Sequence, residues 1–176
     1  EAGPAQQTSL LMGTLVTLTA LAPDSAKADA AFARAFAEME RLIPVFDRHN
    51  AASALSVLNA EGSLPAAPPD LLEVLRESGR LGRDTGFAFN PAVAPVLGLF
   101  EAARTASGGT ASARPIRLDD KALAEALELA KPGGIRSAGG LVRLERSGVR
   151  LALVGLASGY IADAASRSLA ADGLFN

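Results

Sequence analysis

The chain has 176 residues, a formal net charge of −2 and no cysteine. Its length suits one domain with a sizeable core, and the lack of cysteine excludes disulfides, thiolate metal sites and thiol nucleophiles. Charges of both signs are interspersed and tryptophan is absent, so we do not expect nucleic acid as a partner. No apolar run approaches the roughly 20 residues of a membrane-spanning helix, so we do not expect a transmembrane protein.

The first part of the chain changes from polar to apolar. We interpret residues 1–8 as a disordered linker, the stub of a cleaved signal peptide; a cloned fragment is the alternative. Residues 9–176 are expected to form a single domain. Residues 9–21 are apolar and partly β-branched, which predicts a strand interrupted by Gly13.

Helical spacing of apolar residues recurs along the rest of the chain. Residues 26–43 form the clearest pattern, with Asp24 or Ser25 as the cap and Pro44 as the end. The other expected helices cover residues 53–59, 70–81, 92–103, 119–130 and 158–171.

A β-hairpin is predicted near the carboxy-terminal end. Residues 141–145 alternate, Ser147 and Gly148 indicate a turn, and residues 149–154 form an apolar run. Helices mixed with an antiparallel hairpin predict an α+β fold, with a mixed or antiparallel sheet flanked by helices. Residues 174–176 resemble the start of a strand, so we expect a sheet that is incomplete at the carboxy terminus. A missing segment, a partner or a homodimer would then cover its edge.

Four segments carry a resemblance through their order and spacing. They are Leu-Met-Gly-Thr-Leu-Val-Thr at 11–17, Ser-Ala-Leu-Ser-Val-Leu-Asn at 53–59, the Phe-Ala-Phe-Asn-Pro loop within 85–95, and the hairpin and helix at 149–173. Together they resemble the ApbE family of FAD:protein FMN transferases. The resemblance covers the chain from about residue 10 onward.

The resemblance implies a fold, a reaction and a location. The fold would be ApbE-like and related to the T-fold. The family binds FAD as a substrate, uses a divalent metal (usually Mg²⁺), and moves FMN to a Thr or Ser hydroxyl of an acceptor protein. Some members instead hydrolyse FAD to FMN and AMP. A cation suits this reaction because charge builds on phosphoryl oxygens in the transition state. Together with the interpretation of residues 1–8 as the stub of a signal peptide, the resemblance also implies an exported, periplasmic protein.

The family's contacts with FAD map onto seven positions of this chain, and its metal contact onto one. Gly155 matches a position that gives a backbone oxygen to the metal, and the resemblance assigns no catalytic residue. The cofactor-binding positions are Met12, His49, Ala88, Phe89, Asn90, Ala152 and Ser158.

Several of these positions depart from the family pattern. Asn90 and Ala152 replace Asp, Ser158 replaces a common Lys, and the main metal ligands are expected beyond Asn176. Two functions therefore stay open. One is an FAD:protein FMN transferase; the alternative is a non-catalytic pseudoenzyme that binds FAD, FMN or a partner protein without turnover.

Each position also has a simpler structural interpretation. Met12 suits an apolar core, and the lone His49 suits a solvated loop. Phe87 and Phe89 suit anchors that hold their loop in the core.

Overall fold

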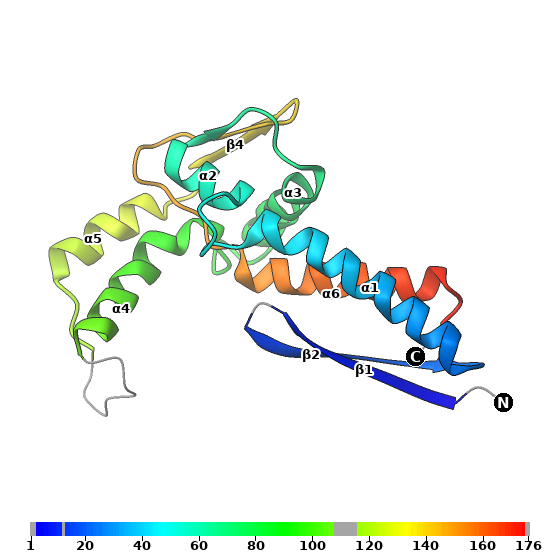
Figure 1. Ribbon diagram of the computed structural model, residues 1–176. Coiled ribbons are helices and arrows are strands. Elements are labelled where there is room, and N and C mark those ends of the chain that lie inside the picture. The colour runs from blue at the N-terminus through cyan, green and yellow to red at the C-terminus, as the bar shows by residue number, and fades with distance from the viewer. Residues whose placement is uncertain (1–2, 12, 108–115, 175–176) are drawn as a thin grey trace. The chain divides into compact units, whose positions relative to one another are not determined.

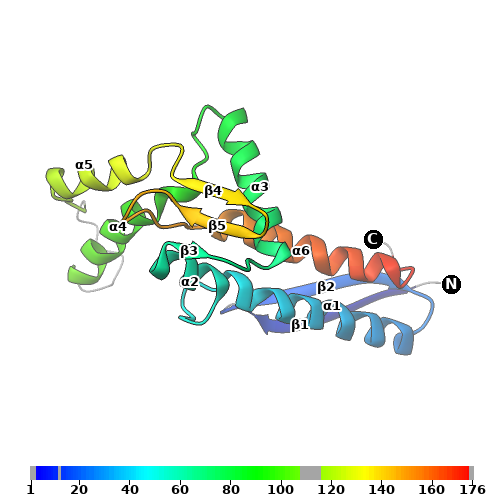
Figure 2. The ribbon, with the colours of Figure 1, turned by 90° about the horizontal axis from the view of Figure 1, so that it is seen from above.

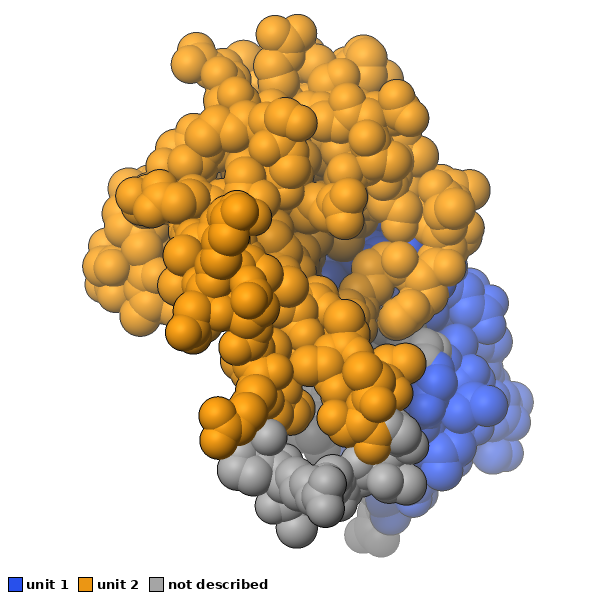
Figure 3. Space-filling model, turned by 90° about the vertical axis from the view of Figure 1, so that its left-hand side faces the viewer, with its two compact units in different colours: residues 1–47, 154–176 blue, residues 48–153 orange. Residues whose placement is uncertain are grey.

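The chain folds into helices and short antiparallel sheets (Figure 1), so the expected α+β class is confirmed. The computed structural model describes residues 3–11, 13–107 and 116–174. They divide into two compact units, shown in separate colours in Figure 3. Unit 1 is Glu1–Asp47 with Val154–Asn176, and unit 2 is Arg48–Leu153. The expectation of a single domain over residues 9–176 stays a prediction.

Unit 1 begins with a two-stranded antiparallel hairpin. Strand β1 (Gly3–Leu11) pairs with β2 (Thr14–Ala22) along the full length of both. The hydroxyls of Thr8 and Thr17, which face each other across the pair, lie 2.9 Å apart and share a hydrogen bond.

The expected disordered linker over residues 1–8 is therefore wrong for residues 3–8. These residues belong to β1 and pair with the end of β2. The hydrogen bonds of a strand pair come from the main chain, so polar side chains do not prevent pairing. The polar composition concealed the first strand.

Helix α1 (Ser25–Phe46) starts at the expected cap. The Lys27 N–H donates to Asp24 Oδ1 at 2.7 Å. The expected end at Pro44 is wrong, because the helix continues to the buried Phe46. Pro44 lies in the last turn of α1. Its missing N–H removes one helical hydrogen bond there but does not end the helix.

Helix α6 (Val154–Ala171) runs beside α1 in unit 1 (Figures 1 and 2). The rings of Phe46 and Tyr160 meet edge to face at 6.0 Å between centroids. Arg34 forms an ion pair with Asp172 just past the end of α6, at 2.8 Å. Gly173 has a φ of +74° and ends the helix in the left-handed conformation that favours glycine.

Unit 2 combines short helices with a three-stranded sheet. Its elements are α2 (Ala54–Glu61), β3 (Ser63–Leu64), α3 (Pro69–Asp84), η1 (Pro91–Val93), α4 (Ala94–Ala106), α5 (Asp120–Leu129), β4 (Ile135–Ala138) and β5 (Leu141–Leu144). The strand order is β3-β5-β4, and α2 packs on β3 and β5.

The expected hairpin between residues 141–145 and 149–154 is wrong. Strand β5 pairs instead with β4, through a turn in which Gly139 and Gly140 have φ values of +56° and +82°. Two consecutive positive φ angles are what a tight two-residue hairpin turn needs, and glycine supplies them. Residues 149–153 lie outside any strand, although Val149, Leu151 and Leu153 are buried.

The expected strand at residues 174–176 is not seen. Leu174, its one described residue, lies in no strand, and residues 175–176 are outside the described residues.

Across residues 3–11, 13–107 and 116–174, no helix has the length and apolar character required to cross a bilayer.

Replacing Asp24 with Ala should lower the free energy of unfolding by about 1 kcal/mol, because the first turn of α1 loses its capping acceptor. Urea denaturation followed by circular dichroism measures the change. The matched control is Asp29→Ala, which removes an exposed carboxylate from the same helix but no cap. Equal losses in both variants would contradict a capping role.

Candidate functional site

The loop that connects α3 to η1 holds three of the expected cofactor-binding residues. Thr85 organises it: its hydroxyl donates to the Leu81 carbonyl at 2.7 Å and accepts from the Phe89 N–H at 3.0 Å. The Phe87 N–H donates to the Gly82 carbonyl at 2.6 Å. The loop is therefore closed on the last turn of α3 and has a defined conformation.

Phe87 adopts an unusual backbone conformation in this loop. Its φ is +65°, a region that a bulky residue seldom occupies. Its ring lies against Gly82, where an added Cβ would come within 3.4 Å of Phe87 Cδ1. Phe87 is 46% exposed, so the expectation that it anchors the loop in the core is wrong. Phe89 is half-buried and Ala88 is exposed.

The Asn90 side chain joins separate parts of unit 2. Its Oδ1 accepts from the Ala92 N–H at 2.9 Å and caps η1. Its Nδ2 donates to the Ala130 carbonyl at the end of α5. An amide makes both contacts, whereas an ionised carboxylate has no N–H to donate. The residue type at position 90 thus matches the partners around it.

Residues 151–153 lie against this loop. The Ala152 N–H donates to the Pro91 carbonyl at 2.8 Å. Asn59 holds the preceding residue from the other direction: its Nδ2 donates to the Leu151 carbonyl at 3.0 Å, and its Oδ1 accepts from the Leu151 N–H at 2.7 Å. The structure thereby brings the Asn90 loop and Ala152 together, and we define this contact as the candidate site.

Asn59 was not among the expected site residues. It ends the Ser-Ala-Leu-Ser-Val-Leu-Asn segment at 53–59, so its place in that segment was the available signal. Its two contacts span 92 positions in sequence and could not be derived from local spacing.

His49 lies in an exposed turn of the same unit. Its neighbour Arg48 contacts Glu101 on α4. Arg48 Nη1 donates to Glu101 Oε1 at 2.8 Å. This hydrogen bond lowers the pKa of the Glu101 carboxyl, and the charges of Arg104 and His49 act in the same direction. His49 therefore belongs to an exposed charged group, and its contact with a cofactor stays a prediction.

The remaining expected residues lie elsewhere. Gly155 and Ser158 are exposed in the first turns of α6, in unit 1, and Met12 lies outside the described residues. Their roles toward flavin and metal stay predictions.

The described residues do not fit the implied divalent cation. Across residues 3–11, 13–107 and 116–174, no group of three or more His, Asp or Glu residues is placed to hold a metal ion. The Asn90 side-chain oxygen accepts from Ala92, and Ala152 offers no side-chain donor.

Replacing Asn90 with Asp should lower the free energy of unfolding by about 1–3 kcal/mol, because the hydrogen bond to Ala130 is lost and two oxygens face each other. Thermal and urea unfolding measure the change.

Asn50→Asp is the matched control. The Asn50 side chain serves as an acceptor: its Oδ1 accepts from the Ala52 N–H at 3.0 Å. A carboxylate at this position accepts equally well. An Asn90→Asp variant as stable as Asn50→Asp would show that the amide donor is not needed.

Known proteins resemble this chain in sequence and in structure. The model of the ApbE family matches residues 12–176. The flavin transferase ApbE of Vibrio cholerae superposes with a TM-score of 0.82 at 20% identity, covering 100% of this chain and 56% of that one. The apo flavinyl transferase ApbE of Pseudomonas stutzeri gives 0.79 at 19% identity, covering 98% and 54%.

A third solved structure agrees. The ApbE protein of Thermotoga maritima gives a TM-score of 0.76 at 19% identity, covering 97% of this chain and 53% of that one. At these identities the structural likeness shows the fold, and the chain spans just over half the length of the structures it matches. No curated protein matches. Because the family's sequence model extends over nearly the whole chain, this protein belongs to the ApbE family.

Proposed function

We propose that this chain forms the flavin-handling part of an FAD:protein FMN transferase. The observation that supports the proposal best is the family match over residues 12–176. The likeness in fold to ApbE flavin transferases agrees with it. In the proposed reaction a Thr or Ser hydroxyl oxygen of an acceptor protein bonds to the FMN phosphorus of FAD. The bond from that phosphorus to the AMP phosphate breaks, the hydroxyl proton is lost, and AMP leaves.

The candidate site offers surfaces for binding rather than groups for proton transfer. Phe89 is half-buried, so its ring can present one face to a planar flavin or adenine while the other side packs on the protein. Thr85 fixes the main chain of this residue through the bond from the Phe89 N–H. Ala88 is exposed and Ala152 is half-buried, and neither side chain extends beyond a methyl group. These features support contact with a flat aromatic ligand.

A second function is favoured by the hydrogen bonds of the Asn90 side chain. Both polar ends of its side chain are occupied by protein groups, and Ala152 carries no polar side chain. A pseudoenzyme that holds FAD or FMN without turnover would need neither residue as a reactive group. The proposed location in the periplasm applies to either function, and fractionation of the native cells tests it.

One assay separates the two functions. The purified chain is mixed with FAD, Mg²⁺ and an acceptor protein that carries an accessible flavinylation sequence. Covalent flavin on the acceptor, with AMP released in equal amount, is the result expected of a transferase. FAD binding without either product indicates the pseudoenzyme. No FAD binding at all contradicts both.

Replacing Phe89 with Ala should weaken FAD binding by about tenfold, because a stacking surface is lost. Flavin fluorescence quenching measures the affinity. The matched control is Phe100→Ala, which removes a 44%-exposed ring from α4, outside the loop. Equal affinity of the Phe89 variant and the native chain would remove this loop from the proposed binding site.

A further inference from the structure

A polar groove lies in unit 2, and no residue of the loop 85–90 lines it. Its volume is about 610 Å³. Residues 59–63, at the end of α2 and the start of β3, form one wall, and residues between 143 and 150 form the other. Its charged side chains are Glu61, Arg143, Arg146 and Arg150. Three arginines against one glutamate leave an excess of positive charge.

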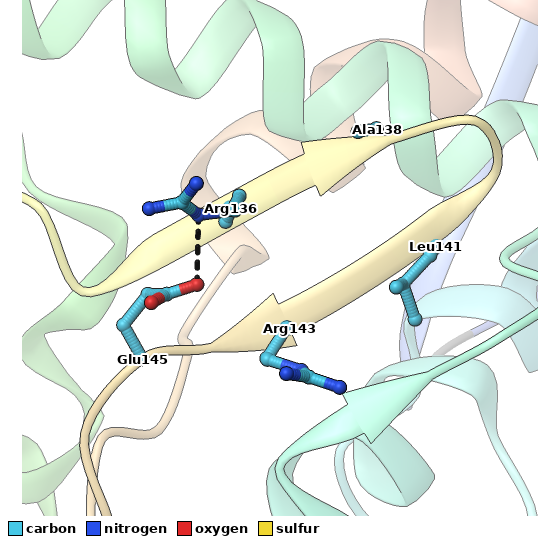
Figure 4. A pocket seen from close by; sticks show the side chains of 5 residues that line it. All are labelled: Arg136, Ala138, Leu141, Arg143 and Glu145. Carbon is cyan, nitrogen blue, oxygen red and sulfur yellow. Dashed lines mark hydrogen bonds and ion pairs between the residues drawn. The ribbon is translucent and has the colours of Figure 1, made fainter.

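The position of Arg143 in the sheet is electrostatically unfavourable unless an anion lies beside it. In the pairing of β4 with β5 it lies directly opposite Arg136, and like charges in that position repel each other. Glu145 neutralises Arg136 through an ion pair at 2.9 Å. Figure 4 shows these two side chains directed at each other, whereas the Arg143 guanidinium extends towards β3. The other carboxylate of the groove, Glu61, forms no ion pair with Arg143.

The guanidinium groups of Arg143 and Arg150 make no hydrogen bond or ion pair with any residue in the described ranges. Their main chains are nevertheless fixed. Arg143 lies in the middle of β5, between two paired strands. Arg150 directly precedes Leu151, whose N–H and carbonyl are both held by Asn59. The two free cations are therefore carried on rigid backbone.

Arg146 forms a fixed part of the same wall. It donates from Nη1 to the Glu128 carbonyl at 3.1 Å and from Nη2 to the carbonyls of Leu129 and Lys131. These contacts cap the carboxyl end of α5, where a positive charge is favourable. Its guanidinium is thus held in position while its charge still acts on the groove.

We propose that this groove binds a ligand that carries a phosphate or diphosphate group. Arg143 and Arg150 donate to the phosphoryl oxygens, and Arg146 contributes positive charge from the wall. Guanidinium groups suit this ligand because their planar N–H pairs match phosphate oxygens in geometry and charge. The volume lies in the range of small-molecule sites. The phosphate can come from the diphosphate of FAD or from a separate phosphorylated compound.

Isothermal titration of the chain with inorganic pyrophosphate tests the proposal. We expect saturable binding that weakens as salt is raised. Arg143→Gln and Arg150→Gln should each weaken it about tenfold or more, because each removes a charged donor. Arg143→Lys keeps the charge but loses the paired donors, and should fall between the native chain and Arg143→Gln.

Arg83→Gln is the matched control, because Arg83 is exposed on α3 and outside the groove. Absence of saturable binding overturns the proposal, as does an equal loss in the Arg83 variant. Thermal unfolding of every variant shows whether its fold is retained. A variant that fails to fold is replaced by Arg143→Lys, whose intermediate affinity is then the deciding result.

A titration with pyrophosphate in the presence of saturating FAD identifies the source of the phosphate. If FAD displaces pyrophosphate and Arg143→Gln also weakens FAD, the groove receives the FAD diphosphate. If both bind together, the groove serves a separate phosphorylated ligand. Pyrophosphate binding without any FAD binding supports the groove and contradicts the flavin proposal, so the two can fail separately.

Discussion

The two hydrogen bonds of the Asn90 side chain set the arrangement of the candidate site. They tie the start of η1 to the carboxyl end of α5, and they fix the residue before Pro91. The Pro91 carbonyl is then in place to receive the Ala152 N–H at 2.8 Å. Without the amide at position 90, the loop would keep the hydrogen bonds of Thr85 and Phe87 but lose its tie to the end of α5.

The proposed flavin site offers surface for binding rather than reactive side chains. The loop is rigid, has an available aromatic surface and lies beside small residues, all of which favour a planar ligand. Within the described ranges the same site has no carboxylate at positions 90 or 152 and no cluster of acidic groups for a cation. A flavin transferase built on this chain would therefore hold FAD here and draw its reactive groups from elsewhere.

Local capping and periodicity predicted most helices. Asp24, Ser53 and Asp119 each accept from a main-chain N–H three residues later, as their positions before apolar-periodic segments indicated. Strands were less predictable. The apolar run at residues 149–154 reflects the burial of Val149, Leu151 and Leu153 rather than a strand, and the real hairpin signal was the glycine pair at 139 and 140.

The site could be predicted only in outline. The order of the four segments indicated the family, and two of the segments do meet at Pro91 and Ala152. The partner of Asn90 could not be inferred, because Ala130 lies 40 positions away and contributes only a main-chain carbonyl. The groove with Arg143 and Arg150 was also hidden, because its walls come from segments at least 80 positions apart.

Hydrogen–deuterium exchange of the chain with and without saturating FAD tests the central claim most directly. If FAD lies on the candidate site, exchange should slow in residues 85–92 and 151–153 while the first turns of α1 stay unchanged. Bound FAD with no protection in residues 85–92 would contradict the account.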